Sequence, residues 1–367
     1  MSLNENQHSP GCDLFRDGYD KAINRLKLLI VTFPNDLGSR TIEANLVKFA
    51  SQFADVRVFR FAAHDSSRID KRLDNRRNFF RRIQDCLQLR SAVAAGVREG
   101  RKILFYNISP ALFAYRAWGK GEAYITMDWA RRLLADRKKP DFDPMTRIHR
   151  KVMEACKAIL PMTDAMAECL RTQYRIEQNR IRQVPSLFDL GHFEPNKIEL
   201  GSPIRLLFIG GDIVRKGGHI LHSEFTKRLS GRCLLTMVTN AELPAVPGIK
   251  QVRGIRYGTV EHLEIMQNHD VLVLPTLEDA GPQVIGEAAA AGLAVFTTRY
   301  ALGAPHVIQD GITGVIAEDA ESCINRLADL IELPEQILIM RKKSLEWMQK
   351  HFSKEKITSR YHDALIS

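Results

Sequence analysis

The sequence lacks the features of a disulfide-bonded, zinc-binding or membrane-spanning protein. It holds six cysteines in 367 residues, and no two of them have Cys-x-x-Cys or Cys/His zinc spacing. Scattered cysteines of this kind are typical of reduced thiols in the cytoplasm. No apolar run approaches the ~18–20 residues that cross a membrane. The first 25 residues lack the apolar segment of a signal peptide, so we expect a cytoplasmic protein.

Excess positive charge is missing from the C-terminal half. Residues 1–200 hold 35 Lys and Arg against 24 Asp and Glu, whereas residues 201–367 hold 18 against 19. The length predicts two domains. Because the excess positive charge lies in the N-terminal half, we expect that half to meet an anionic partner, such as a lipid surface or an acidic or phosphate-bearing acceptor. No nucleic-acid-binding motif accompanies the charge, so we expect no nucleic-acid partner.

Much of this charge lies in residues 68–82, which carry seven cations and two acids in a segment expected to be helical. One interpretation is a solvated face above an apolar stripe, Ile69, Leu73, Phe80, Ile83 and Leu87, that packs on the core. The other is docking on an anionic membrane, at ~1 kcal/mol per cation near the surface. The candidates for contact with a membrane or an acidic acceptor are Arg72, Arg76, Arg77, Arg81 and Arg82.

Apolar runs alternate with helical segments along the chain, which is typical of parallel α/β folds. In the first half we expect strands at 26–33, 56–59, 103–106, 124–126 and 158–162, and helices up to residue 53 and over 66–96 and 143–157. In the second half we expect strands at 204–209, 233–238, 250–254, 270–275 and 293–297, and helices near 335–350 and up to residue 365. Residues 191–203 are polar and rich in Gly and Pro, so they read as a linker.

Two segments of the second half have the form of ligand loops. In the first, an apolar strand leads through a Pro/Gly loop with two acids, Glu278 and Asp279, into a small-residue helix that holds Glu287 in its expected first turn. Free backbone N–H groups and the helix dipole at such a place suit a phosphate or a sugar. Pro282 cannot donate. The N–H donors expected here are those of Gly281, Gln283 and Val284.

The other segment lies upstream, where a strand ends at Gly210 and Gly211 and the cations Arg215 and Lys216 precede a new helix. Two cations in such a loop can neutralise a diphosphate without a metal. The segment is neither a P-loop nor a GxGxxG fingerprint. The alternative is that both cations are solvated at a helix start, although a helix N-terminus disfavours cations that have no anion nearby.

Taken together, the strand-GG-x3-RKGG segment and the D-x7-E segment resemble glycosyltransferase family 4. The resemblance covers 204–317 most strongly and extends to 150–195, and it implies the α/β GT-B fold: two Rossmann-like domains whose parallel sheets face a central cleft. The expected parts are an extension (1–25), an acceptor domain (26–190), a linker (191–203), a nucleotide-sugar domain (204–345) and a helix crossing back to the first domain (346–367).

The family resemblance implies a metal-independent retaining transferase that uses a nucleotide sugar. UDP- or GDP-sugars are the expected donors, no cofactor is expected, and the acceptor is a glycan or a lipid-linked glycan. The enzyme would lie in the cytoplasm or at the inner face of the cytoplasmic membrane. Two alternatives stay open: a non-catalytic nucleotide-sugar-binding subunit of a glycan assembly, and a GT-B nucleotide-sugar epimerase.

The same resemblance assigns roles to individual residues. Glu287 would bind the donor ribose, although a carboxylate there could also serve only to complement the helix dipole. Asp279 takes the place of the glutamate that is the first acid of the family motif. Glu278, beside it, is the second candidate for this acid. Arg215 and Lys216 would contact the diphosphate, whereas the family's usual arginine is replaced by Gly211.

Two further candidates lie in the N-terminal half. Gly38 follows the first strand, where the family has a glycine-rich loop near the diphosphate; a simple turn glycine is the alternative. Asp128 replaces a family histidine that contacts the transferred sugar. It could bond a sugar hydroxyl or help to take the acceptor proton, or it could cap a helix. The expected catalytic residues are Asp128, Asp279 and Lys216.

Overall fold

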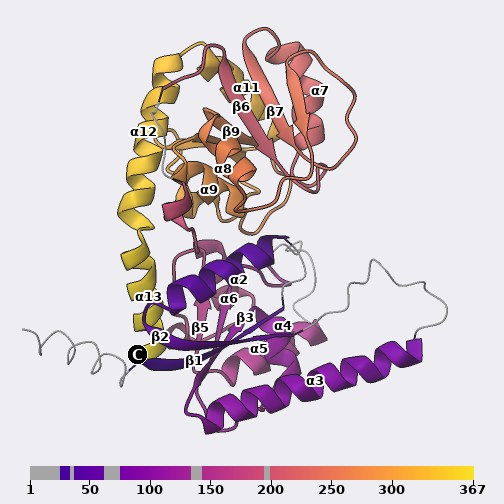
Figure 1. Ribbon diagram of the computed structural model, residues 1–367, viewed down its shortest axis with the longest axis vertical. Coiled ribbons are helices and arrows are strands. Elements are labelled where there is room, and N and C mark those ends of the chain that lie inside the picture. Colours follow the sequence, from indigo (N-terminus) through magenta and orange to yellow (C-terminus); the bar gives the residue numbers. More distant parts are fainter. Residues whose placement is uncertain (1–24, 34–36, 62–74, 134–142, 194–198) are drawn as a thin grey trace, which may run out of the picture.

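The computed structural model describes residues 25–33, 37–61, 75–133, 143–193 and 199–367, and it contains two parallel β-sheets (Figure 1). The first sheet has the strand order β2-β1-β3-β4-β5 and the second the order β11-β10-β9-β6-β7-β8. The first contains β1 (Leu26–Thr32), β2 (Ala54–Arg60), β3 (Lys102–Tyr106), β4 (Ala123–Met127) and β5 (Ala158–Pro161). The second contains β6 (Ile204–Ile209), β7 (Cys233–Val238), β8 (Ile249–Val252), β9 (Val271–Leu274), β10 (Ala294–Thr298) and β11 (Gly314–Ala317). The predicted α/β class with two parallel sheets is confirmed.

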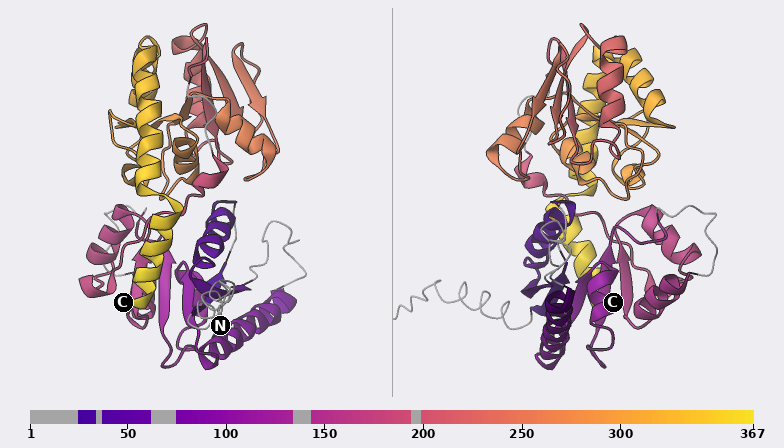
Figure 2. Two further views of the ribbon diagram at one scale, coloured as in Figure 1. Left: turned by 60° about the vertical axis from the view of Figure 1, so that its left-hand side comes forward. Right: turned by 90° about the vertical axis from the view of Figure 1, so that its right-hand side faces the viewer.

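Helices connect and cover the strands (Figures 1 and 2). Those of the first half are α2 (Leu37–Ala50), α3 (Asn75–Arg98), α4 (Ile108–Phe113), α5 (Pro144–Glu154) and α6 (Asp164–Thr172). Those of the second half are α7 (Gly218–Arg228), α8 (Val260–Gln267), α9 (Gln283–Ala290), α10 (Ala304–Val307), α11 (Ala320–Ile331), α12 (Pro334–His351) and α13 (Lys354–Ile366). Within the described part of the chain, no helix has both the length and the apolar composition that a membrane crossing needs.

Each sheet has one point where the strand order reverses direction. In the second sheet β6 lies between β7 and β9, so the chain winds outwards first on one side of β6 and then on the other. Open α/β sheets bind ligands at the carboxyl ends of the strands beside such a reversal point, which here are β6 and β9. The two predicted ligand loops follow these same two strands.

The apolar pattern of the strands explains their placement. All four residues of β9, Val-Leu-Val-Leu, are fully buried, as expected for a central parallel strand covered on both faces. In β1, Leu28 and Ile30 belong to the core that extends towards the second sheet, whereas Leu29 and Val31 belong to a separate core on the opposite face. This alternation follows from the two-residue period of a strand.

The expected strands all form, with ends shifted by a few residues. Strand β11 was not predicted, because its four residues follow a Gly-rich turn and have no clear period. The expectation of a core-packed stripe on the basic helix was wrong at its C-terminal end. The side chains of Ile83 and Leu87 are 42 % and 61 % exposed, and Leu89 and Val93 pack on the core instead. Arg72 lies outside the described residues.

The last helix, α13, fastens the C-terminus to the first sheet, beside which it lies in Figure 1. The carbonyl oxygen of Leu365 accepts hydrogen bonds from Lys102 Nζ (2.6 Å) and Tyr124 Oη (2.9 Å). Arg182 Nη1 donates to the carbonyl of Ala364 (2.8 Å). Cations at a helix C-terminus satisfy its free carbonyls and complement its dipole. The C-terminus is therefore anchored on the domain that holds the N-terminal half.

A buried ionic cluster holds α12 against the start of β9. Asp270 is fully buried and accepts hydrogen bonds from the backbone N–H of Gly201 (3.1 Å) and from the backbone and guanidinium of Arg205. Arg341 of α12, 3 % exposed, donates to Asp270 Oδ1 (2.6 Å) and to the carbonyls of Glu199 and Gly292. Every charge in the cluster is thus paired and hydrogen-bonded, which burial requires.

Replacing Asp270 by Asn should therefore destabilise the C-terminal domain strongly. We expect a loss of about 3–5 kcal/mol in the free energy of unfolding, because Arg341 is left as a buried charge without its partner. Denaturant titration followed by circular dichroism measures it. The matched control is Arg299→Ala, which removes an exposed pair with Glu318 and should cost less than about 1 kcal/mol. Equal losses for the two variants would contradict the assigned role of the cluster.

Candidate active site

The loops after β6 and β9 are in direct contact at the carboxyl ends of their strands. The carbonyl of Arg215 accepts hydrogen bonds from Leu277 N (2.9 Å) and Thr276 Oγ1 (3.0 Å). Gly217, the N-cap of α7, has a φ of 70°, and a Cβ there would lie 1.9 Å from the carbonyl oxygen of Pro275. Only glycine allows this close approach.

The contact brings the predicted cations and the predicted acid together. Lys216 Nζ contacts Asp279 Oδ2, and Arg215 Nη1 lies 3.4 Å from the same oxygen. Arg215 Nη1 also donates to the carbonyl of Glu278 (3.0 Å). The side chains of Lys216 and Asp279 are 13 % and 11 % exposed, whereas Glu278 is exposed. The structure thus unites Arg215, Lys216 and Asp279 in one charged group.

Asp279 is fixed through its backbone as well as its side chain. Its N–H donates to the carbonyl of Tyr300 (2.9 Å), and its carbonyl accepts from Leu302 N (2.8 Å). Its second carboxylate oxygen, Oδ1, accepts from Gly281 N (3.3 Å). Asp279 therefore holds the loop and the two cations in place, and Gly281 N–H, one of the predicted free donors, is already used.

Lys216 lies in an environment that works against its charge. Burial is the main cause that lowers its pKa, and the neighbouring Arg215 guanidinium lowers the pKa further, whereas Asp212 and Glu287 act in the opposite direction. The direct contact with Asp279 Oδ2 favours the ammonium form. An anionic ligand would also favour the charged form.

Helix α9 begins at the same place. Its N-cap is Pro282, which makes no side-chain capping bond, so the first amides of the helix, at Gln283 and Val284, lack a cap of that kind. Glu287 is the fifth residue of α9, so its expected position in the first turn was wrong. Its side chain is 8 % exposed. Because the dipole effect fades beyond the first turn, dipole complementation alone explains this buried carboxylate poorly.

Aromatic rings and a histidine surround Glu287. His262 Nε2 of α8 lies 3.6 Å from Glu287 Oε2. The His262 ring lies 5.4 Å from the ring of Tyr257 and 6.0 Å from that of Phe193. Burial raises the pKa of the Tyr257 phenol, and the Glu287 charge raises it further while a hydrogen bond from Asn45 of α2 lowers it. Glu287 thus lies close to His262 and Tyr257, and Asn45 of the N-terminal half reaches the same phenol.

Asp128, from the N-terminal domain, lies close to the loop after β9. A Cβ built on Gly281 would lie 3.8 Å from Asp128 Cβ and 3.9 Å from its Oδ2. The hydroxyl of Tyr106, at the end of β3, lies 3.4 Å from Asp128 Oδ1. Residues 128–133 form no helix, and the N-cap of the next described helix is Asp143. The helix-cap interpretation of Asp128 was therefore wrong.

The remaining predicted residues are three glycines and the arginines of the basic helix. Gly210 packs against Phe208 and Lys216, whereas a Cβ on Gly211 would meet nothing within 4 Å. Gly38 was expected in a loop but is the second residue of α2. The remaining arginines, at 76, 77, 81 and 82, lie in α3, on the side of the first sheet away from the second sheet (Figure 1).

Sequence reasoning missed two residues near these loops. His262 has no motif, and only the structure shows it beside Glu287. Asn107 follows β3 with φ 68° and ψ 168°, a region that is almost exclusive to glycine. Its Oδ1 is buried and has no hydrogen-bond partner among the described residues. Asn107 thus combines a strained backbone with a buried amide oxygen at the reversal point of the first sheet, and the sequence does not signal it.

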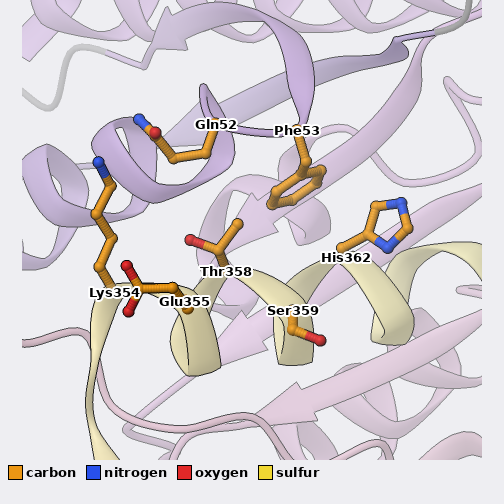
Figure 3. Close-up of a pocket in the computed structure, with 7 residues that line it drawn as sticks. All are labelled: Gln52, Phe53, Lys354, Glu355, Thr358, Ser359 and His362. Carbon is orange, nitrogen blue, oxygen red and sulfur yellow. The ribbon is translucent and has the colours of Figure 1, made fainter. Parts of the chain in front are cut away.

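A pocket of about 540 Å³ lies elsewhere, between the end of α2 and α13 (Figure 3). None of the predicted site residues lines it. Its lining residues are Gln52, Phe53, Lys354, Glu355, Thr358, Ser359 and His362.

Comparison with solved structures identifies the fold. The chain is similar to a glycosyltransferase from Rickettsia africae ESF-5 (TM-score 0.71, 13 % identity, 94 % of this chain and 100 % of that one). It is also similar to the sucrose-phosphate synthase tll1590 from Thermosynechococcus elongatus (TM-score 0.71, 14 % identity, 93 % and 98 %). A third is Anabaena Alr3699/HepE in complex with UDP and glucose (TM-score 0.68, 13 % identity, 92 % and 99 %). The protein has the GT-B glycosyltransferase fold, as predicted.

The sequence comparison points to the same class through the second domain. Residues 203–333 match the family described as "Glycosyl transferases group 1". No curated protein sequence matches the chain. The matched range contains both loops and α9, so the expected resemblance to GT-B glycosyltransferases is confirmed.

The close approach of the two loops can be tested directly by adding a methyl group at Gly217. Gly217→Ala should destabilise the C-terminal domain by more than about 2 kcal/mol, because the new methyl group meets a backbone carbonyl and the backbone has positive φ. Gly211→Ala, in the same loop but with open space around it, is the control and should leave the melting temperature unchanged. A fully stable Gly217→Ala protein would contradict this loop packing.

Proposed function

We propose that the protein is a retaining glycosyltransferase that moves a sugar from a nucleotide diphosphate sugar to a glycan or lipid-linked glycan acceptor without a metal. The observation that carries this proposal is the group of Arg215, Lys216 and Asp279 beside the N-terminus of α9. This group lies at the reversal point of the matched domain. The complex of the similar HepE protein with UDP supports a UDP-sugar as one of the two expected donors.

The chemistry needs stabilisation of the leaving nucleoside diphosphate. Arg215 and Lys216 are fixed before the donor arrives, so they can oppose the growing phosphate charge without large rearrangement. In the present state Asp279 neutralises Lys216. When the donor binds, its diphosphate would replace Asp279 as the partner of Lys216 or share Lys216 with it. Asp279 would then act chiefly by orienting the cations. Glu278, which is exposed, is left as the acid free to meet a sugar hydroxyl.

The acceptor side is assigned to the N-terminal domain. Asp128 lies against Gly281 and receives support from Tyr106. A carboxylate there can accept a hydrogen bond from a sugar hydroxyl or from the acceptor. In front-face attack the departing phosphate helps to take the acceptor proton, so no separate carboxylate nucleophile is needed.

The basic helix α3 supports a further part of the proposal, docking on an anionic membrane. Its N-terminal turns carry Arg76, Arg77, Arg81 and Arg82, and the next turns expose Ile83 and Leu87. Cations next to exposed apolar side chains are typical of helices that lie on a membrane surface. Such a position would bring the acceptor domain to a lipid-linked substrate.

The donor site is tested with Glu287→Ala. This variant should weaken donor binding by about 1.5–3 kcal/mol, because a buried carboxylate loses its hydrogen bonds to the ribose hydroxyls. The measurement begins with a thermal-shift screen of UDP-, GDP-, ADP- and dTDP-sugars without added metal. Titration calorimetry with the stabilising donor then compares wild type and variant.

The control is Glu264→Ala, an exposed glutamate on α8, which should bind the donor as the wild type does. Unchanged affinity in Glu287→Ala would remove Glu287 from the site. Donor binding without any transfer or slow donor hydrolysis would favour a non-catalytic subunit. Conversion of the donor to an isomer without an acceptor would favour an epimerase.

The membrane proposal predicts that reversing Arg76, Arg77, Arg81 and Arg82 to Glu abolishes binding to anionic vesicles and spares donor binding. At ~1 kcal/mol per cation, the loss should exceed two orders of magnitude. Sedimentation with phosphatidylglycerol vesicles measures it at several salt concentrations. Reversal of Lys342 and Lys343 on α12 is the control. Persistent vesicle binding by the α3 variant would contradict the membrane proposal.

A further inference from the structure

The position of His262 beside Glu287 is not explained by packing alone. His262 is the third residue of α8, and Thr259 Oγ1 accepts a hydrogen bond from its backbone N–H (3.4 Å) at the helix start. Its side chain is 5 % exposed, and Nε2 points to Glu287 Oε2 at 3.6 Å. Nδ1 is buried and has no hydrogen-bond partner in the described part of the chain.

Aromatic neighbours restrict the imidazole to this orientation. The Tyr257 ring lies at 5.4 Å with a tilt of 55°, and the Phe193 ring lies at 6.0 Å nearly edge-on, at 73°. Phe193 comes from the segment between the sheets and is itself buried. The ring is therefore held from two sides by residues of two different segments.

An apolar side chain would suit this place better if packing were its only role. A buried nitrogen without a partner destabilises the folded state, and an isolated polar atom among aromatic rings has no structural benefit. The useful group is Nε2. With the proton on Nε2, the neutral ring offers a donor to Glu287 and leaves the acceptor Nδ1 as the atom without a partner.

We propose that His262 is a positioning residue for Glu287, which holds Oε2 so that Oε1 is directed to the vicinal hydroxyls of the donor's ribose. The inference rests on the proposed function. The present distance of 3.6 Å is beyond a hydrogen bond, and the inference requires the pair to close to hydrogen-bond distance when the ribose engages the carboxylate. Orienting a ligand-binding carboxylate through a second residue is a common device of preorganised sites.

The test is the preference for ribose over 2′-deoxyribose, measured in the full-length protein by calorimetry with UDP, GDP and their 2′-deoxy forms. His262→Leu should bind the ribonucleotide at least fivefold more weakly and lose most of the ribose preference. His262→Gln, whose amide nitrogen can reach the position of Nε2, should keep the preference within about threefold of wild type. His262→Asn, whose shorter amide mimics Nδ1, should behave like His262→Leu.

Thermal stability distinguishes a positioning role of His262 from a packing role. His262→Leu should melt at or above the wild-type temperature, because it removes the buried unpartnered nitrogen. A stable Leu variant with unchanged ribose preference would overturn the proposal. If the Leu variant does not fold, the Gln and Asn pair decides: equal preference in both would also overturn it.

Glu287→Gln distinguishes failure of this inference from failure of the proposed donor site. If Glu287→Gln loses the ribose preference and His262→Leu keeps it, Glu287 binds the ribose without help from His262. If Glu287→Gln also keeps the preference, the ribose lies elsewhere, and the donor-site assignment is overturned with the inference.

Discussion

The site depends on one steric constraint, the close approach of the loop after β6 to the loop after β9. Gly217 places its backbone against the carbonyl of Pro275, and the carbonyl of Arg215 accepts two hydrogen bonds from the second loop. This contact brings Lys216 within reach of Asp279 and sets both beside the start of α9. Without it, two cations and an acid from distant segments would not form a single preorganised group.

The parts of the site that were predictable from sequence follow from local rules. The apolar runs before residues 210 and 275 identify parallel strands, and the glycines and cations after them mark loops at the ligand edge of the sheet. The resemblance carried by these loops is confirmed at the level of the GT-B fold. Local pattern also located the two C-terminal helices, α12 and α13, to within a few residues.

The parts that were missed depend on contacts between distant segments. Nothing in the sequence around His262 indicates Glu287, because their proximity arises from the packing of α8 near α9. The pairing of Asp279 with Lys216 joins two loops that are 63 residues apart, and the sequence around either residue does not indicate it. The exposed Ile83 and Leu87 show a similar limit, because a helical stripe reveals which residues share a face but not which face meets the core.

Two buried carboxylates, Asp270 and Glu287, differ in how their oxygens are used. Asp270 is fully buried, and both of its oxygens are used by two arginines and the backbone N–H of Gly201. Glu287 is almost as buried, and His262 Nε2 lies 3.6 Å from its Oε2, which is beyond hydrogen-bond distance. A carboxylate whose bonds are complete can only support the fold. Glu287 instead lies close to His262 and acts on the pKa of Lys216, and such groupings of ionisable side chains are typical of functional sites. This contrast between the two acids, together with the sequence spacing, supports the proposal that the donor binds at Glu287.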